Sequence, residues 1–440
     1  MMEAGSRRIA PDALAALLAA EIARWGVPGV VAGVTAGGES VVRCAGVTSL
    51  ADPQPVTEET RFRVASITKP FTATVAALLG AEGLLALDAP VHRAVPALRL
   101  TDPVAQETVT PRQLLAHLSG LECEPPHHLV VPGADTAALS RAIAAFPGVG
   151  QLTRPGELWS YCNTGYWLAG HAAAQAAGAP FEEVVRALLL EPLGLTGSGF
   201  VHDGTPPAGA ALGHAPRRPG DLTHDVLAGY RFPRSRVPSG GLVSTAPDLL
   251  RFAGLHLGEA LLDLQQPVAD GVGVRWGTGW SVDDATGARV VAHAGSHGGF
   301  QAQLTLVPAH GIAVVVLTNS GRGSAVARAV VEWALAEAAG LRAPVPTALP
   351  DPFDDHHGLV GRYTAQHLEA VVTAQPAGTI EIAQRSELAT GSFAAPPPLR
   401  GVEVAPGLFV VPDGEARGAR FDFPAPGRLR VSGRLALRRP

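Results

Sequence analysis

The sequence predicts an α/β protein in which one antiparallel sheet, flanked by helices, carries an inserted all-helical subdomain and is followed by a small all-β module. Two features of the 440 residues lead to this fold class. Strand-forming segments lie at both ends of the first 340 residues, and the stretch between them is mostly helical in pattern. After a proline-rich stretch, the chain changes to short alternating segments. We therefore expect a first domain at 1–343, a linker at 344–352 and an all-β domain at 353–440.

The expected sheet of the first domain combines a strand pair from each end. In the first pair, Gly37-Gly38 separates two short apolar runs, a spacing typical of an antiparallel hairpin. Helical patterns precede the first pair and follow the second, and the first helix is expected to end at Gly26. A cleft is expected between the sheet and the helical insertion. The expected strands are 29–36, 40–46, 301–308 and 312–318, and the last helix is 324–339.

Two helix starts in the inserted region carry clear signals. Thr110-Pro111-Arg112-Gln113 and Thr245-Ala246-Pro247-Asp248 each supply a threonine that can cap a helix, an early proline and a polar third residue. An apolar run follows each of them. We expect both to begin structural helices of the insertion.

The C-terminal module contains short segments in which apolar and polar residues alternate, which is typical of a sheet or barrel. It contains no set of side chains typical of catalysis. Two roles stay open: the module braces or dimerises the first domain, or it covers the cleft and restricts the substrate. The expected strands are 368–374, 379–383, 408–411, 419–423 and 428–437.

Composition narrows the classes of function. Hydrophobic residues make up 47% and charged residues 17% of the chain, and the net charge of -5 offers no basic surface for nucleic acid. A small-molecule or peptide substrate is therefore expected. The three cysteines and the histidines lack the spacing of a disulfide framework or zinc site, so we expect no metal or other cofactor and a reducing, cytoplasmic location. No apolar segment reaches membrane-spanning length, so no membrane partner is expected.

Lys69 is the only lysine in a chain whose Lys and Arg residues number 34. Arginine stays protonated in proteins, whereas a buried lysine can become a neutral amine and act as a base. Ser66 and Lys69 lie three residues apart at the start of an expected helix, so their side chains would share one face. The positive end of the helix dipole would favour the neutral amine and an oxyanion beside the serine. The plainer alternative is a chance S-x-x-K in which Ser66 caps the helix.

A second polar segment, 159–165, lies just before an alanine-rich helix. In an extended chain, Tyr161 and Asn163 would point to the same side and Cys162 to the other. A phenol beside a deprotonated lysine can relay a proton, and an amide can bind both a substrate carbonyl and the lysine. The alternative is that Tyr161 packs in the core.

A third segment, His293-Ala294-Gly295-Ser296-His297-Gly298-Gly299-Phe300, joins two expected strands. Glycines such as Gly295 and Gly298 would let a substrate backbone approach the strand closely, and the N–H of a following residue could bind a developing oxyanion. The alternative is a glycine-rich hairpin with a surface histidine.

Taken in order, Ser66-Ile67-Thr68-Lys69, Tyr161-Cys162-Asn163 and His293-Ala294-Gly295 resemble the three motifs of the serine β-lactamase and penicillin-binding-protein superfamily. The Y-x-N form is similar to the class C branch with its related esterases, D-amino-acid peptidases and transesterases. Further matching text stands at 114–121 (LLAHLSGL), 240–249 (GGLVSTAPDL) and 298–300. The resemblance spans about residues 10–340, and it implies a β-lactamase-like first domain with a lipocalin-like all-β domain after it.

The resemblance also implies roles for individual residues. Ser66 would be the acylated nucleophile and Lys69 its base, and Tyr161 would pass a proton to the leaving group. Asn163 would orient Lys69 and the acyl side chain, and the backbone N–H groups of Ser66 and Ser296 would form the oxyanion hole. His293 stands where the related β-lactamases carry the lysine of K-T-G. Because imidazole grips a carboxylate less firmly than lysine does, this departure favours the esterase, peptidase and acyltransferase relatives.

The leading hypothesis is a serine hydrolase that passes through an acyl-enzyme on Ser66 and cleaves an ester or amide, including a D-configured peptide. The close alternative is an acyltransferase, in which an amine captures the same intermediate. The motifs and the β module resemble penicillin-binding-protein-type thioesterases that release and cyclise nonribosomal peptides, for which a carrier-protein-bound thioester would be the substrate. A third alternative is a sensor that is acylated without turnover. An α/β-hydrolase is not expected, because no G-x-S-x-G occurs.

Overall fold

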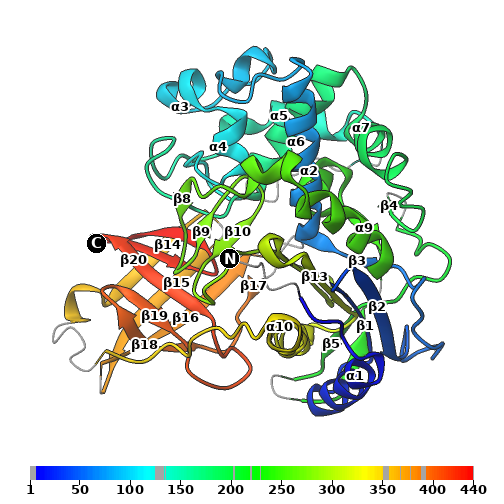
Figure 1. Cartoon of the computed structure of the whole chain (residues 1–440). Helices are drawn as coiled ribbons and strands as arrows, with labels where there is room; N and C mark the ends of the chain where they lie inside the picture. The colour runs from blue at the N-terminus through cyan, green and yellow to red at the C-terminus, as the bar shows by residue number, and fades with distance from the viewer. Residues whose placement is uncertain are drawn as a thin grey trace, which may run out of the picture.

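The computed structural model describes residues 6–123, 133, 135–201, 204–218, 221–227, 229–349, 356–366, 368–376, 378–387 and 393–439. Its sheet of eight strands has the order β2-β1-β13-β12-β11-β10-β9-β8 and runs from right to left in Figure 1. All of its pairings are antiparallel, and β1 lies between β2 and β13, so the predicted strand pairs from the two ends meet in one sheet. The strands are β1 (Gly29–Ala36), β2 (Glu39–Gly46), β8 (Ala269–Asp270), β9 (Arg275–Trp276), β10 (Ser281–Asp283), β11 (Val290–His297), β12 (Phe300–Val307) and β13 (Ile312–Thr318).

Alternation along β1 explains why both faces of the sheet are covered. Val30, Ala32 and Val34 pack in one apolar cluster with residues of the terminal helices α1 (Pro11–Trp25) and α10 (Gly323–Ala339). On the other face, a Cβ added to Gly33 would lie 2.8 Å from a methyl carbon of Leu250 in α9 (Ala246–Leu257), so α9 packs directly on the strand backbone there. The sheet is thus the middle layer between two layers of helices, and Figure 1 shows α1 and α10 together on one side of it.

The region between β2 and β8 is mostly helical, and helices α3 to α7 of this region lie in the upper part of Figure 1. Both predicted caps are present: Thr110 accepts a hydrogen bond from the N–H of Gln113 (3.2 Å), and Thr245 accepts one from the N–H of Asp248 (3.3 Å). The further α-helices are α2 (Thr68–Ala81), α3 (Pro103–Thr108), α4 (Pro111–Leu115), α5 (Ala138–Ala144), α6 (Asn163–Ala177), α7 (Phe181–Val185) and α8 (Val237–Gly240). The short strands are β3 (Phe62–Arg63), β4 (Gly199–Phe200), β5 (His214–Pro216), β6 (His224–Val226) and β7 (Leu242–Ser244).

Helix α2 is buried on almost every side, because it packs against α6 and α8. Phe71 of α2 stacks on Phe252 of α9 with ring centroids 3.7 Å apart. This position carries the start of α2 into the centre of the molecule. The remaining short helical turns are η1 (Ala65–Ile67), η2 (Val91–Arg93), η4 (Phe146–Gly148), η5 (Arg186–Leu190), η6 (Arg234–Arg236), η7 (Glu259–Gln265), η8 (Pro308–His310) and η9 (His356–Gly358).

The C-terminal segment folds into a closed β barrel, as the lipocalin-like prediction required. Its eight barrel strands follow the order β15-β14-β22-β21-β20-β19-β18-β16, and β15 also pairs with β16, which closes the sheet. Inward-facing residues such as Tyr363, Phe409 and Phe421 form its apolar core. The strands are β14 (Gly361–Ala365), β15 (Leu368–Gln375), β16 (Thr379–Glu387), β17 (Phe393–Ala394), β18 (Leu399–Ala405), β19 (Leu408–Val410), β20 (Arg420–Ala425), β21 (Arg428–Val431) and β22 (Arg434–Arg438).

The single strand expected at 428–437 was wrong, because this stretch is the β21–β22 hairpin. The chain reverses at Ser432 and Gly433, which have φ values of 52° and 74°. Two consecutive residues with positive φ are typical of a tight hairpin turn, and glycine accepts such angles without strain. This turn lies against the helical part of the chain, where the carbonyl of Gly433 accepts a hydrogen bond from the N–H of Tyr161.

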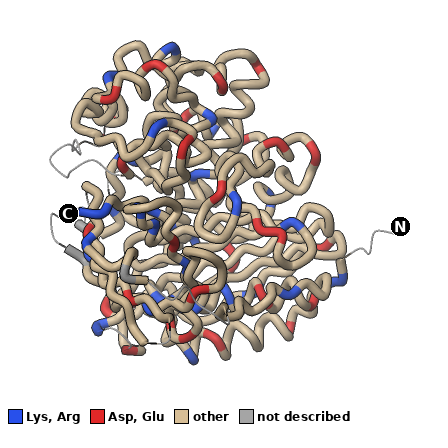
Figure 2. Tube along the Cα trace, turned by 90° about the vertical axis from the view of Figure 1, so that its left-hand side faces the viewer, with Lys and Arg blue, Asp and Glu red and all other residues tan. Residues whose placement is uncertain are grey.

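The stretch between α10 and the barrel has no regular secondary structure over 341–349. Residues 350–355, which contain the end of the expected linker and the expected start of the β module, lie outside the described residues. The division into domains at this stretch stays a prediction. Figure 2 shows positive and negative residues interspersed along the described chain. Within the described part of the chain, no helix combines the length and apolarity needed to cross a membrane.

Arg430 joins the barrel to the rest of the protein. Its guanidinium forms a buried ion pair with Asp422 of the neighbouring strand. It also donates hydrogen bonds to the backbone carbonyls of Asp270 (2.8 Å), Gly271 (3.2 Å) and Trp159 (3.4 Å). One barrel side chain therefore fixes the barrel to β8 and to the segment that leads to Tyr161.

Candidate active site

Ser66 lies in the short helical turn η1, directly before α2. Ala65, which precedes it, has a φ of 45° and is buried. A non-glycine residue with positive φ is strained, and such residues concentrate at functional sites. The turn is held by Thr68, whose hydroxyl donates to the carbonyl of Ala65 (2.7 Å) and accepts from the N–H of Leu242 (3.0 Å). The start of the helix thus presents Ser66, which stays partly exposed, in a fixed orientation.

Lys69 is fully buried, and its Nζ lies between Ser66 and the α8 segment. Nζ donates to the Oγ of Ser66 (3.0 Å) and to the carbonyl of Ser239 (2.7 Å). The side chain of Ser239 is held in turn. Its Oγ donates to the carbonyl of Arg236 (2.9 Å) and accepts from the indole N–H of Trp167 (2.9 Å), so the Ser239 carbonyl that binds Lys69 is fixed in place. The predicted pairing of Ser66 with Lys69 is therefore present as a short, oriented contact.

Tyr161 lies beside this pair, and the Nζ of Lys69 is 4.8 Å from the centre of its ring. Asn163 does not continue an extended segment as expected, because it is the first residue of α6. Cys162 occupies the N-cap position, and its sulfur accepts a hydrogen bond from the N–H of Gly165 (3.3 Å). Cys162 is buried, as predicted, and burial raises the pKa of its thiol to about 12. Cysteine is not one of the usual N-cap residues, so the sequence pattern did not show that the helix begins directly after Cys162.

His293 lies on β11 and is 3% exposed, so it is not the surface histidine of the alternative reading. Its Nδ1 is 2.7 Å from the carbonyl of Ala294. Because a carbonyl oxygen only accepts, Nδ1 carries the proton and Nε2 keeps a lone pair, and Nε2 has no hydrogen-bond partner among the described residues. Burial, followed by the nearby charge of Lys69, lowers the pKa of His293 to about 3. The site therefore holds a neutral imidazole 6.2 Å from the ring of Tyr161, measured between ring centres.

Gly295 is packed against the backbone that leads to Ser66. A Cβ added to it would lie 2.1 Å from the carbonyl oxygen of Val64 and 3.2 Å from the backbone nitrogen of Ser66. Only glycine fits at this distance. Ser296 follows on β11, and its Oγ accepts from the side chain of Gln301 (2.8 Å). Gly298 lies farther along, in the β11–β12 turn, where its carbonyl packs on Gly213.

Several residues of the site had no predicted role. The aromatic residues Trp159 and Trp276 stack with ring centres 4.9 Å apart, and Trp276 contacts both Tyr161 and His293 edge-on. From the barrel, the carbonyl of Gly433 accepts from the N–H of Tyr161 (2.9 Å). The guanidinium carbon of Arg434 lies 5.6 Å from the centre of the Tyr161 ring. The site is thus built from α2, β11, the start of α6 and a barrel hairpin.

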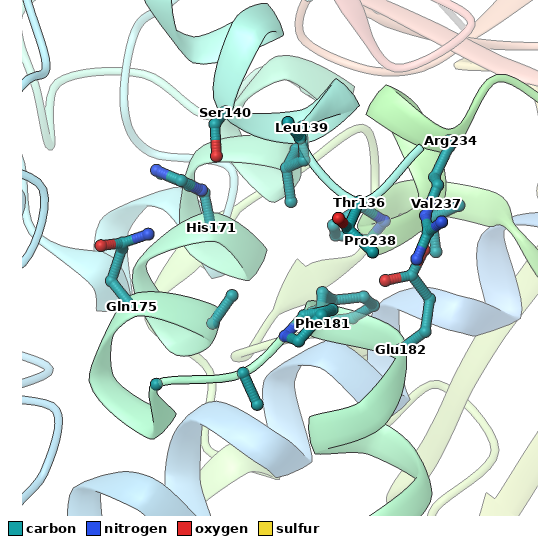
Figure 3. Close-up of a pocket in the computed structure, with 15 residues that line it drawn as sticks. Thr136, Leu139, Ser140, His171, Gln175, Phe181, Glu182, Arg234, Val237 and Pro238 are labelled. Carbon is teal, nitrogen blue, oxygen red and sulfur yellow. The ribbon is translucent and has the colours of Figure 1, made fainter. Parts of the chain in front are cut away.

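A cavity of about 440 Å³ lies beside the C-terminal half of α6, away from Asn163 at the start of that helix. Figure 3 shows Ser140, His171 and Gln175 at one end, and the ion pair of Glu182 with Arg234 (2.8 Å) at the other. None of the candidate catalytic residues lines it. The described residues also contain no group of three His, Cys, Asp or Glu side chains that could hold a metal ion.

Comparison with known proteins agrees with this geometry. The family model described as Beta-lactamase matches residues 14–339. Penicillin-binding protein 4 of Amycolatopsis lactamdurans is 30% identical over 353 residues, which cover 74% of this chain and 91% of that protein. Esterase EstB of Burkholderia gladioli is 33% identical over 354 residues, which cover 66% of this chain and 86% of that protein.

The likeness to a solved structure also includes the barrel. A crystal structure of SurE is 26% identical, with a TM-score of 0.73, and the match covers 98% of this chain and 99% of that chain. SurE has also been crystallised with D-Leu, and that structure matches with a TM-score of 0.72. The matched region contains all three motifs, with Ser66, Tyr161 and His293 in their expected order. The chain therefore belongs to the beta-lactamase family, the serine hydrolases that include the penicillin-binding proteins and their esterase relatives.

Proposed function

We propose that the protein is a serine acyl-enzyme hydrolase that cleaves an ester or amide through Ser66. The observation that carries the proposal is the contact between the Nζ of Lys69 and the Oγ of Ser66 (3.0 Å), made by a fully buried amine in a chain with a single lysine. A buried amine loses its proton more readily than one in water, because desolvation disfavours the charged form. Lys69 thus has the position and the chemistry of the base.

In the acylation step, neutral Lys69 accepts the hydroxyl proton of Ser66 while the Oγ attacks the carbonyl carbon of the substrate. The bond to the leaving group breaks as the tetrahedral intermediate collapses. The phenol of Tyr161 donates a proton to the departing oxygen or nitrogen, and the proton taken up by Lys69 restores the phenol. The position of Lys69 beside the Tyr161 ring, with Nζ 4.8 Å from the ring centre, supports this exchange.

The developing oxyanion would be bound by the backbone N–H groups of Ser66 and Ser296. The approach of Gly295 to the nitrogen of Ser66 supports this assignment, because it brings β11 beside the nucleophile. In deacylation, water attacks the acyl carbonyl, and the same base and relay return the proton to Ser66. Asn163 at the first position of α6 would contact the acyl group and Lys69.

The site favours substrates without a carboxylate beside the scissile bond. His293 replaces the lysine of K-T-G, and burial keeps its pKa at about 3, so it offers a neutral lone pair instead of a positive charge. Two observations support a D-configured peptide or amide as one such substrate: the family membership, and the likeness to SurE, whose crystals contain D-Leu. The esterase relative supports simple esters as surrogate substrates.

A second candidate is an acyltransferase, in which an amine and not water captures the acyl group. The whole-chain likeness to SurE favours it, because it includes the barrel and because D-Leu offers an amine. A peptide macrocyclase acting on a carrier-bound thioester would be one form of this activity. The barrel hairpin beside Tyr161 would then help to exclude water and bind the acceptor.

Intact-mass analysis tests the proposal directly. The protein is incubated with p-nitrophenyl butyrate, a D-Ala-ended peptide, benzylpenicillin and a peptidyl thioester, and the mass increase and its position are measured. An acyl adduct on Ser66, absent from Ser66→Ala, followed by turnover is the expected result. A linear acid from the thioester indicates the hydrolase and a macrolactam the transferase. An adduct that never turns over indicates a sensor, and no adduct on Ser66 refutes all three.

A further inference from the structure

We propose that His117 is the positioning residue of Tyr161, so that this histidine sets the direction in which the phenol passes its proton. The inference rests on the proposed function, because it concerns the placement of the tyrosine that relays the proton. His117 lies after α4, in the segment 114–121, and is fully buried. His117 takes no part in the proton transfer itself and acts by holding the chain around Tyr161.

The backbone N–H groups of three successive residues, with Tyr161 in the middle, all donate hydrogen bonds, and His117 accepts two of the three. The N–H of Ser160 donates to the carbonyl of His117 (3.0 Å), and the N–H of Cys162 donates to its ring Nδ1 (2.9 Å). The N–H between them, that of Tyr161, donates to the carbonyl of Gly433 in the barrel (2.9 Å). The segment is therefore held from two sides, and His117 binds it both before and after Tyr161.

The ring of His117 also supports the phenol ring directly. The ring centres of His117 and Tyr161 are 4.4 Å apart, with the planes inclined by 30°. On its other sides the imidazole contacts Tyr166, Trp159 and Trp276. The imidazole is thus enclosed by aromatic side chains, and its position determines where the phenol can lie relative to Lys69.

Two properties of His117 suit this task. Its φ of 61° is left-handed, which lets one residue present both its carbonyl and its ring nitrogen to the same neighbouring segment. Its Nδ1 accepts a hydrogen bond, so the ring proton must be on Nε2 and the ring must be neutral. Burial, followed by nearby positive charge such as that of Arg434, keeps the pKa of His117 well below the usual value, so the acceptor is not lost by protonation.

The test compares two amides at position 117. In His117→Asn the amide oxygen takes the place of Nδ1, and asparagine tolerates a positive φ. His117→Gln carries the same amide one carbon farther out and cannot place an acceptor there. Should the Gln variant fail to fold, His117→Gly replaces it, because glycine accepts the backbone angle and lacks the acceptor. Thermal unfolding and active-site titration confirm that each rate refers to folded protein.

The readout is the dependence on the leaving group. Nitrophenolate is a good leaving group and departs without a proton, whereas an alkoxide must be protonated as it departs. Only cleavage of an alkyl ester therefore depends on the position of the Tyr161 phenol. With ethyl butyrate, we expect kcat/KM to fall by about 100-fold in the Gln variant and by less than about 10-fold in the Asn variant. The burst of nitrophenolate from p-nitrophenyl butyrate should stay within about 3-fold of wild type in both.

A second comparison asks whether His117 acts through Tyr161. In a Tyr161→Phe background, adding His117→Gln should change kcat/KM by less than about 3-fold, because the group that His117 positions is already absent. Equal losses on both esters, additive effects with Tyr161→Phe, or full activity of the Gln variant on ethyl butyrate would each overturn the inference while leaving the acyl-enzyme intact. A wild-type protein that forms no acyl adduct on Ser66 with any substrate of the intact-mass panel overturns the proposed function, and this inference with it.

Discussion

The backbone N–H of Tyr161 donates to the carbonyl of Gly433, 2.9 Å away, so the C-terminal barrel contacts the candidate catalytic tyrosine directly. The next barrel residue, Arg434, places its guanidinium carbon 5.6 Å from the phenol ring and donates from Nε to the sulfur of Cys123 (3.1 Å). Leu435 donates its N–H to the hydroxyl of Ser160 (3.1 Å). Of the two roles left open for the β module, these contacts support bracing of the site. Covering of the cleft stays a prediction.

The first prediction concerns Arg430, which fixes the barrel to the rest of the protein. Arg430→Met removes the guanidinium that donates to the buried carboxylate of Asp422 and to three backbone carbonyls. We expect the free energy of unfolding to fall by about 3–5 kcal/mol, because an unpaired buried charge remains. Urea unfolding measures the change, and ester turnover per folded protein should fall as well.

The matched control for Arg430→Met is Arg400→Met on the same barrel. Arg400 pairs with Glu381 at the surface, where its side chain is 74% exposed. Its loss should cost less than about 1 kcal/mol. Similar losses in the two variants would show that the buried ion pair does not anchor the barrel.

The second prediction concerns Lys69. Both Lys69→Arg and Lys69→Met should lower the rate of Ser66 acylation by at least about 1000-fold, because neither side chain can accept the hydroxyl proton. Lys69 is fully buried, so the larger arginine should also cost about 1–3 kcal/mol through overpacking. Stopped-flow acylation with p-nitrophenyl butyrate decides the matter, and an arginine variant with wild-type acylation would refute the role of Lys69.

The third prediction concerns Gly295. In Gly295→Ala the new methyl would lie 2.1 Å from the carbonyl oxygen of Val64, so β11 must move away from Ser66. Since the oxyanion hole would be built from these two segments, we expect kcat/KM to fall by about 100-fold on any ester. Gly254→Ala is the control: it lies in α9, nothing is within 4 Å of its added Cβ, and alanine should stabilise the helix by up to about 1 kcal/mol. Normal activity of Gly295→Ala would contradict the proposed oxyanion hole.

The parts of the fold that were predicted from sequence are those specified locally. The Gly37-Gly38 hairpin, the capping threonines Thr110 and Thr245 and the end of α1 at Gly26 each depend on residues a few positions apart. Strands such as β8 and β9 are two residues long and carry no alternation to detect. They belong to the sheet only because they continue it beyond β11 and β10, and this position depends on the tertiary structure.

The candidate site shows the same division. Ser66, Lys69, Tyr161 and His293 stood out because their side chains are chemically specific and because the three motifs resemble a family. Gly433 and His117 contribute a backbone carbonyl and a left-handed backbone angle, and neither leaves a trace in residue type. His117 was visible only as one letter of the segment LLAHLSGL, and the ring nitrogen that receives the N–H of Cys162 depends on the fold.

The fourth prediction concerns acid. Burial lowers the pKa of His256 and of His293 to about 3, whereas an unfolded histidine titrates near its ordinary value of 6.5. Between these values the unfolded chain binds more protons than the folded one, so acid favours unfolding. The stability contributed by the neutral rings is complete above pH 6.5 and is lost as the pH falls toward 3, by about 1.4 kcal/mol per pH unit for each ring. His256→Phe, which changes no candidate catalytic residue, should flatten the slope of unfolding free energy against pH by that amount between pH 6 and 4, whatever its stability at pH 8. Urea unfolding across this range measures the slope, and an unchanged slope would mean that His256 is not kept neutral by burial.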